Sequence, residues 1–118
     1  MKKLFTLLSA AVLSLALFSQ APEKMSFQAV IRNTSGELVK NTVIGMKISI
    51  LNSSPTGTAV FVETHTPTTN INGLVSLVIG EGNPVTGTMD GIDWSEGMYF
   101  LKTETDPSGG TNYTITGT

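Results

Sequence analysis

From about residue 26 onward, short apolar runs alternate residue by residue with polar ones, and this period constrains the fold more than any other feature. In the clearest run, residues 43–51, Lys47 and Ser49 take one parity and four apolar residues take the other, namely Ile44, Met46, Ile48 and Ile50. Successive side chains of a β-strand point to opposite faces, so this pattern predicts a strand with one buried face. No long stretch after the first 19 residues repeats with the period of an amphipathic helix.

Strands of this kind are predicted six times, with a seventh, short edge strand near Val85. The six are residues 26–32, 43–51, 58–66, 74–79, 98–105 and 112–116. Between them lie clusters of Gly, Pro, Asn, Asp and Ser, which favour turns. These connections are too short to hold crossover helices, so the strands should pair antiparallel. Half-buried faces must cover one another, and we therefore predict an all-β domain over residues 26–118, an antiparallel β-sandwich of six to seven strands.

The orientation of the third predicted strand is less obvious than that of the second. We expect Val60 and Val62 to face the core, because Glu63 then lies on the other face, where its charge stays hydrated. His65 lies two residues after Glu63 and should share its face. A Glu–His pair can orient an imidazole for base chemistry. The favoured interpretation is two polar residues on a solvated sheet face, since no third partner or Gly-rich nucleophile turn accompanies them.

The N-terminus has the pattern of a secretory signal peptide. Lys2 and Lys3 are followed by an uncharged, mostly apolar stretch over residues 4–18. This run is shorter than the roughly 20 residues needed to cross a bilayer, so no transmembrane anchor is expected in the mature chain. We predict a signal peptide over residues 1–19, cleaved after Ser19 or after Gln20, then an extended segment over residues 20–25. The protein should be exported to the periplasm, the outer surface or the extracellular space.

Composition excludes several classes of function. The chain has no cysteine, which rules out disulfides, thiol catalysis, Cys-based zinc sites and the lipid-bearing cysteine of a bacterial lipoprotein. Its formal charge of −2 becomes about −4 once Lys2 and Lys3 are removed with the leader. The remaining basic residues are scattered, so nucleic acid is not an expected partner. The loop Gly80-Glu81-Gly82 lacks the third glycine and following helix of a phosphate-binding motif.

The remaining candidate site residues are few and weak. Asp90, Asp93 and Glu96 lie in or beside a Gly-containing loop, and oxygen ligands on a loop are what calcium uses. Their spacing matches no known calcium loop, so solvated turn formers are the simpler interpretation. Trp94 and Phe61 would suit a sugar-stacking surface if both were exposed. No catalytic residue, no cofactor and no other metal site is predicted, and we do not expect an enzyme.

Residues 21–33, APEKMSFQAVIRN, resemble the opening phrase of a group of exported bacterial surface proteins, just after their signal peptides. The resemblance continues through residues 41–50, 63–70, 73–75, 102–107 and 113–117. In that group the domain is an uncharacterised N-terminal β-sandwich module, often followed by tail-fibre-like or collagen-like segments. It carries over no catalytic residues. Such relatives continue into a Ser/Leu-rich linker where this chain stops at Thr118, which indicates a truncated gene or a fragment.

A looser likeness is to immunoglobulin-like and transthyretin-like or carboxypeptidase-regulatory-like sandwiches, an analogy of fold that licenses no function. Together, the resemblances imply a non-enzymatic structural or interaction module of a secreted or cell-surface protein, the N-terminal part of a longer chain. Downstream domains of that chain or surface glycans would be its partners. The alternative is a carbohydrate- or calcium-binding β-sandwich module.

Overall fold

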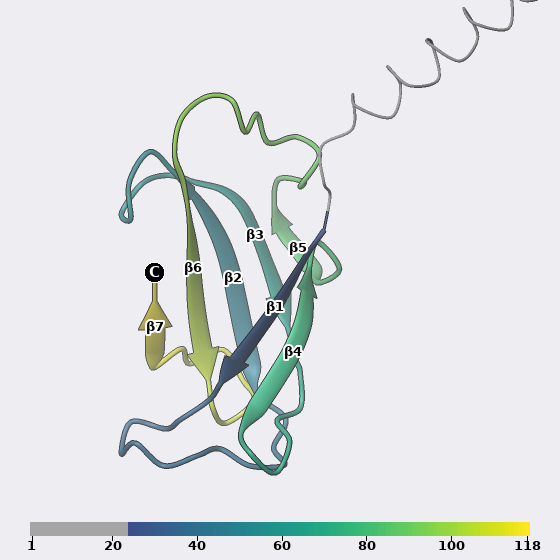
Figure 1. Cartoon of the computed structure of the whole chain (residues 1–118), viewed down its shortest axis with the longest axis vertical. Helices are drawn as coiled ribbons and strands as arrows, with labels where there is room; N and C mark the ends of the chain where they lie inside the picture. The colour runs from purple at the N-terminus through teal and green to yellow at the C-terminus, as the bar shows by residue number, and fades with distance from the viewer. Residues whose placement is uncertain (1–23) are drawn as a thin grey trace, which may run out of the picture.

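A computed structural model describes residues 24–118; the predicted signal peptide and residues 20–23 lie outside the described residues. The described chain forms seven strands in two antiparallel sheets (Figure 1). The strands are β1 (Met25–Val30), β2 (Gly45–Asn52), β3 (Ala59–His65), β4 (Leu74–Ile79), β5 (Asn83–Thr86), β6 (Tyr99–Asp106) and β7 (Ile115–Gly117). Within these residues no helix is long and apolar enough to span a membrane. The predicted antiparallel all-β sandwich is confirmed.

The two sheets differ in width. The larger has the order β5-β3-β2-β6-β7, and the smaller consists of β1 and β4 alone. β1 and β4 pair without a register shift, from Met25 opposite Ile79 to Val30 opposite Leu74. This pair crosses the front of the five-stranded sheet and leaves β7 and most of β6 without a facing strand (Figure 1).

The core lies where the two sheets overlap, and the central strand β2 provides its floor. Ile44, Met46, Ile48 and Ile50 are each at most 2% exposed. Above them lie buried side chains of β4 and half-buried ones of β1, namely Val75, Leu77, Ile79, Phe27 and Ala29. Burying each large apolar side chain stabilises the fold by about 1.5–3 kcal/mol. The faces predicted from the alternation in these three strands are therefore confirmed.

The predicted orientation of β3 is wrong. Ile48 pairs with Glu63 and Ile50 with Phe61, and directly opposed residues of an antiparallel pair share a face. Glu63 therefore points into the core and is 2% exposed, while Val62 is buried on the opposite face of the sheet. Both parities of this strand carry apolar residues, so alternation alone could not decide between them.

The last strand is shorter and later than predicted. β7 covers Ile115–Gly117 and pairs with β6 from Thr105 opposite Ile115 to Thr103 opposite Gly117. Asn112 is outside it, because its N–H donates to the Asp106 carboxylate at 2.9 Å and closes the preceding loop. The short strand near Val85 is confirmed as β5, at the other edge of the sheet.

Candidate functional site

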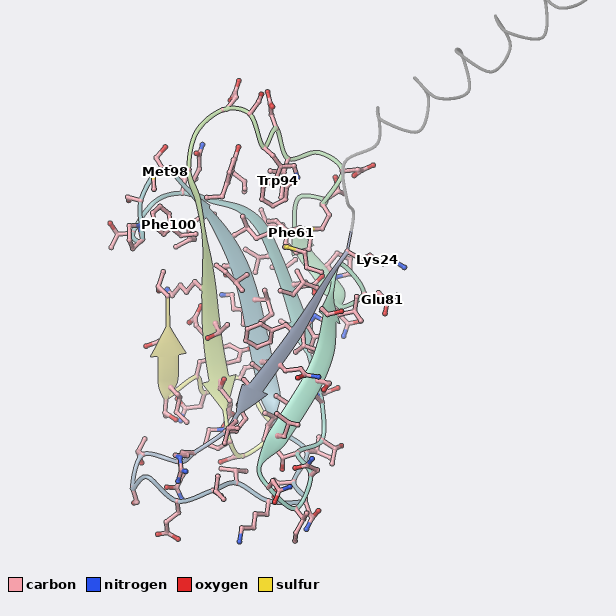
Figure 2. The ribbon with its side chains drawn as sticks, in the orientation of Figure 1. Lys24, Phe61, Glu81, Trp94, Met98 and Phe100 are labelled. Carbon is pink, nitrogen blue, oxygen red and sulfur yellow. The ribbon has the colours of Figure 1, made fainter. Side chains whose placement is uncertain are left out.

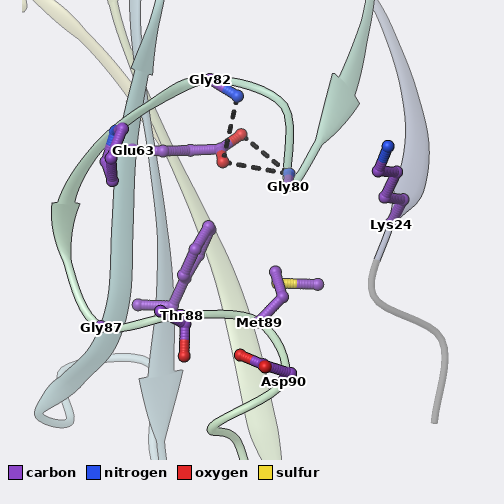
Figure 3. Close-up of a pocket in the computed structure, with 10 residues that line it drawn as sticks. Lys24, Glu63, Gly80, Gly82, Gly87, Thr88, Met89 and Asp90 are labelled. Atoms are coloured by element: carbon purple, nitrogen blue, oxygen red, sulfur yellow. Dashed lines mark hydrogen bonds between the residues drawn. The ribbon is translucent and has the colours of Figure 1, made fainter. Parts of the chain in front are cut away.

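The buried carboxylate of Glu63 is the centre of the candidate site. The N–H of Gly80 donates to both carboxylate oxygens, at 3.0 and 3.1 Å, and the N–H of Gly82 donates to Oε1 at 3.3 Å. The ring Nε2 of His65 contacts the second oxygen. A buried carboxylate is costly unless it is fully hydrogen-bonded. These donors supply that bonding and fasten the turn between β4 and β5 to the middle of β3 (Figure 3).

Two glycines allow this turn to approach the carboxylate. Gly80 has a φ of 107°, which residues with a side chain rarely adopt. At Gly82, an added Cβ would lie 2.6 Å from the His65 ring and 2.7 Å from the carbonyl oxygen of Thr64. The loop that fails as a phosphate motif is thus a small anion-binding nest of backbone N–H groups. The anion that it binds is a side chain of the same protein.

Beside Glu63 lies an open cleft of about 270 Å³. Thr88, Met89 and Asp90 line it across from the carboxylate, and Lys24 lies on the side of β1 (Figure 3). Lys24 Nζ lies 2.9 Å from Glu81 Oε1. Both of those side chains are more than half exposed, so their ion pair adds little stability. The cleft thus offers an exposed carboxylate at Asp90, while the oxygens of Glu63 are already occupied by donors of the chain.

Burial contradicts the favoured interpretation of the Glu63–His65 pair as a solvated one. The side chains of Glu63 and His65 are 2% and 11% exposed, so the solvated interpretation is wrong. Their shared face is confirmed, and it is the core face. The Glu63 carboxylate is hydrogen-bonded to the turn between β4 and β5, and the His65 ring contacts that carboxylate. In the sequence, the two glycines of the turn were the signal that pointed to this contact. The sequence did not show which residues of β3 face the core, and without that the contact could not be predicted.

The calcium candidates are not brought together. Asp93 accepts hydrogen bonds from the N–H and the hydroxyl of Ser95, at 3.1 and 2.5 Å. The Ser95 hydroxyl is the main reason that the pKa of the Asp93 carboxyl lies below its ordinary value of 3.8. Asp90 and Glu96 are exposed. Over residues 24–118, no group of three or more His, Cys, Asp or Glu residues is placed to hold a metal ion.

The two aromatic candidates lie at the same end of the sandwich but differ in exposure (Figure 2). Phe61 is 4% exposed and belongs to the core, so it presents no ring to a sugar. Trp94 is half-buried and packs edge-on against Tyr99, with ring centroids 5.1 Å apart. Its Nε1 is buried and has no hydrogen-bond partner in the described part of the chain.

Trp94 also lines a second, largely apolar cleft of about 190 Å³. The other lining residues are Met25, Ile50, Tyr99, Phe100 and Leu101. The Tyr99 hydroxyl donates to the carbonyl oxygen of Asp93 at 2.6 Å, which holds the loop carrying Trp94 over the start of β6. Trp94 could be identified from the sequence as a candidate, but this cleft could not, because its walls come from β1, β2 and β6.

Comparison with known proteins yields one match. Residues 26–118 match the family model described as Domain of unknown function (DUF8740). No curated protein and no solved structure matches the chain.

Proposed function

Because the chain belongs to the DUF8740 family, whose function is unknown, we propose its role from its geometry. It is a non-enzymatic structural or interaction module of an exported protein. As the sequence resemblance implies, it forms the N-terminal part of a longer surface chain, with a sandwich of the immunoglobulin-like or transthyretin-like kind.

The observation that carries this proposal is that polar side chains of the loops hydrogen-bond to the backbone of the loops themselves. Several accept hydrogen bonds from the backbone of their own loop. Asn33 accepts from the N–H groups of Ser35 and Glu37, and Asn70 from those of Asn72 and Leu74. Asp106 does the same for the loop between β6 and β7. Side chains used in this way fix loop shape, as a rigid spacer or docking module requires.

Export is the part of the proposal that an experiment can test first. Expressed with its leader in a bacterial host, the chain should leave the cytoplasm and begin at Gln20 or Ala21 by intact mass. A variant with Lys2→Glu and Lys3→Glu should be exported less efficiently, because the basic start of the leader is removed. Cytoplasmic protein that still begins at Met1 would contradict the proposal.

A carbohydrate-binding module is the second candidate, and the half-buried Trp94 beside its apolar cleft is the observation in its favour. A ligand that binds only the folded state raises the melting temperature with its concentration. We expect no rise with a panel of plant, bacterial and animal oligosaccharides, or with Ca²⁺. A saturable rise with one sugar, lost in Trp94→Ala, would favour the second candidate over the first.

A further inference from the structure

The outer edge of β1 is open. β1 pairs with β4 on one side, and no other described strand pairs with it. All six of its residues are uncharged, it contains no proline, and its register with β4 has no bulge. Folded proteins normally protect a sheet edge with charged side chains, a proline, a β-bulge or a very short edge strand. β5, at an edge of the larger sheet, contains Pro84 and a register shift, and β7 has only three residues. The two strands of the smaller sheet, β1 and β4, therefore have outer edges without such protection, and of these two strands β1 is the one that also lines the apolar cleft beside Trp94.

The polar groups of this edge point away from β4 at alternate residues. The N–H of Ile31, just after β1, donates to the carbonyl oxygen of Gly73 at 2.8 Å. In an antiparallel pair the N–H and C=O of one residue point to the same side of the strand, and this side alternates from each residue to the next. The backbone groups of Ser26, Gln28 and Val30 therefore face the open edge, and all three residues are exposed.

The apolar cleft that contains Trp94 begins at the same place. Met25, the first residue of β1, forms one wall, and Leu101 and Ile50 belong to the sheet behind. Leu101 and Tyr99 are only half-buried, because no strand of the smaller sheet covers this part of β6 (Figure 1). A strand added beside β1 would gain backbone hydrogen bonds along the edge and place an apolar side chain in this cleft.

A second copy of the protein does not fit this edge. β1 has six residues, so the edge is about 20 Å long and only one strand wide. The area that it offers is far below the roughly 800 Å² that each partner of a stable interface buries. The five-stranded sheet also extends past β1 beneath the open edge (Figure 1). Pairing β1 with its copy about a two-fold axis would bring β6 and β7 of the two molecules into the same space. A single extended segment avoids this overlap.

We propose that the β1 edge and the adjacent cleft bind one extended, uncharged segment of another protein by strand addition. The segment has alternating small polar and apolar side chains, and one large apolar side chain occupies the cleft beside Trp94. β1 has no charged residue that could pair with a charged ligand, and a charged side chain in the apolar cleft would lose hydration without gaining a partner. This inference rests on the proposed interaction role and specifies the class of partner.

The test uses the purified, folded protein and a synthetic peptide, Lys-Thr-Val-Thr-Leu-Thr-Val-Thr-Lys, in which terminal lysines outside the paired segment give solubility. Trp94 is the only tryptophan of the chain, so its emission reports on the cleft directly. We expect a saturable blue shift, with half-saturation at or below about 1 mM. The same peptide with proline in place of the central leucine should bind at least about tenfold more weakly, because it cannot extend the ladder.

The matched protein variants are Gln28→Pro and Gln28→Ala. Gln28 is exposed, so the first change removes an outward N–H without removing a core side chain, and edge strands tolerate proline. Binding should weaken at least about tenfold in Gln28→Pro and stay within about twofold in Gln28→Ala.

Three results would overturn the proposal: no shift of Trp94 emission up to about 1 mM peptide, equal binding of the two peptides, or equal binding by the two variants. If Gln28→Pro does not fold, the two peptides still decide the question with the unmodified protein. Neither measurement depends on where the chain is located in the cell. Failure here is thus distinct from failure of the export assay.

Discussion

Replacing Glu63 by alanine should cost far more stability than an ordinary surface change. The carboxylate accepts hydrogen bonds from the N–H groups of Gly80 and Gly82, and the His65 ring contacts it as well. The two backbone donors belong to the main chain, so no substitution at Glu63 can remove them along with their acceptor.

The expected size of the effect follows from those two donors. Gly80 is exposed and Gly82 is half-buried, so water can partly replace the lost acceptor, and each lost hydrogen bond costs about 0.5–1.5 kcal/mol. The two bonds together then contribute about 1–3 kcal/mol, and the emptied volume beside His65 adds to this. The free energy of unfolding of a small domain is only about 5–15 kcal/mol. Glu63→Ala should therefore lose at least about 1–3 kcal/mol, and Glu63→Gln should lose less, because it keeps one acceptor oxygen.

Urea unfolding followed by Trp94 fluorescence measures this loss directly. Glu81→Ala is the matched control, since Glu81 is in the same turn but its side chain is 52% exposed and forms an ion pair with the exposed Lys24. That control should change the free energy of unfolding by no more than about 1 kcal/mol. If Glu63→Ala unfolds within about 0.5 kcal/mol of the parent, as a surface change would, the carboxylate does not hold the turn and our account of the site is wrong.

Three further changes test other parts of the structure. Gly82→Ala should destabilise the domain by more than about 1 kcal/mol in the same urea assay, because the new Cβ would clash with the carbonyl oxygen of Thr64; an unchanged midpoint would mean that the turn can move. The pKa of Asp106 is lowered from 3.8, chiefly by the hydrogen bond from the Ser108 N–H. The ionised carboxylate therefore stabilises the fold fully above its unfolded pKa, and this stabilisation is lost as the pH falls through the lower, folded pKa. The melting temperatures of the parent and Asp106→Asn should therefore converge between about pH 5 and about pH 2, and a constant difference would contradict the assignment. Deleting residues 113–118 removes β7, whose apolar side chain is only half-buried, so calorimetry should show a cooperative transition weakened by about 1–3 kcal/mol, whereas complete unfolding would show that this edge is essential.

The strands could be predicted from sequence wherever their two faces differ sharply in polarity. In β2, Met46, Ile48 and Ile50 share one parity and oppose Lys47 and Ser49. In β4, Val75, Leu77 and Ile79 oppose Ser76. The local pattern then indicates which face meets the core, and the structure has those core faces, although Ser49 on the other face of β2 is also buried. β3 lacks this contrast, because Phe61 and Val62 compete for the core.

The sequence by itself determined the class of the fold, because alternation and turn residues act over a few neighbours along the chain. Only the tertiary structure decided where the charge of Glu63 goes. Its donors, Gly80 and Gly82, lie 17 and 19 residues further along the chain, and a buried carboxylate is affordable only where folding brings such groups together. The open edge of β1 was decided in the same way. The seven strands divide into a two-stranded and a five-stranded sheet, and this division decides whether a strand has one neighbour or two. No local pattern in Met25–Val30 encodes that division.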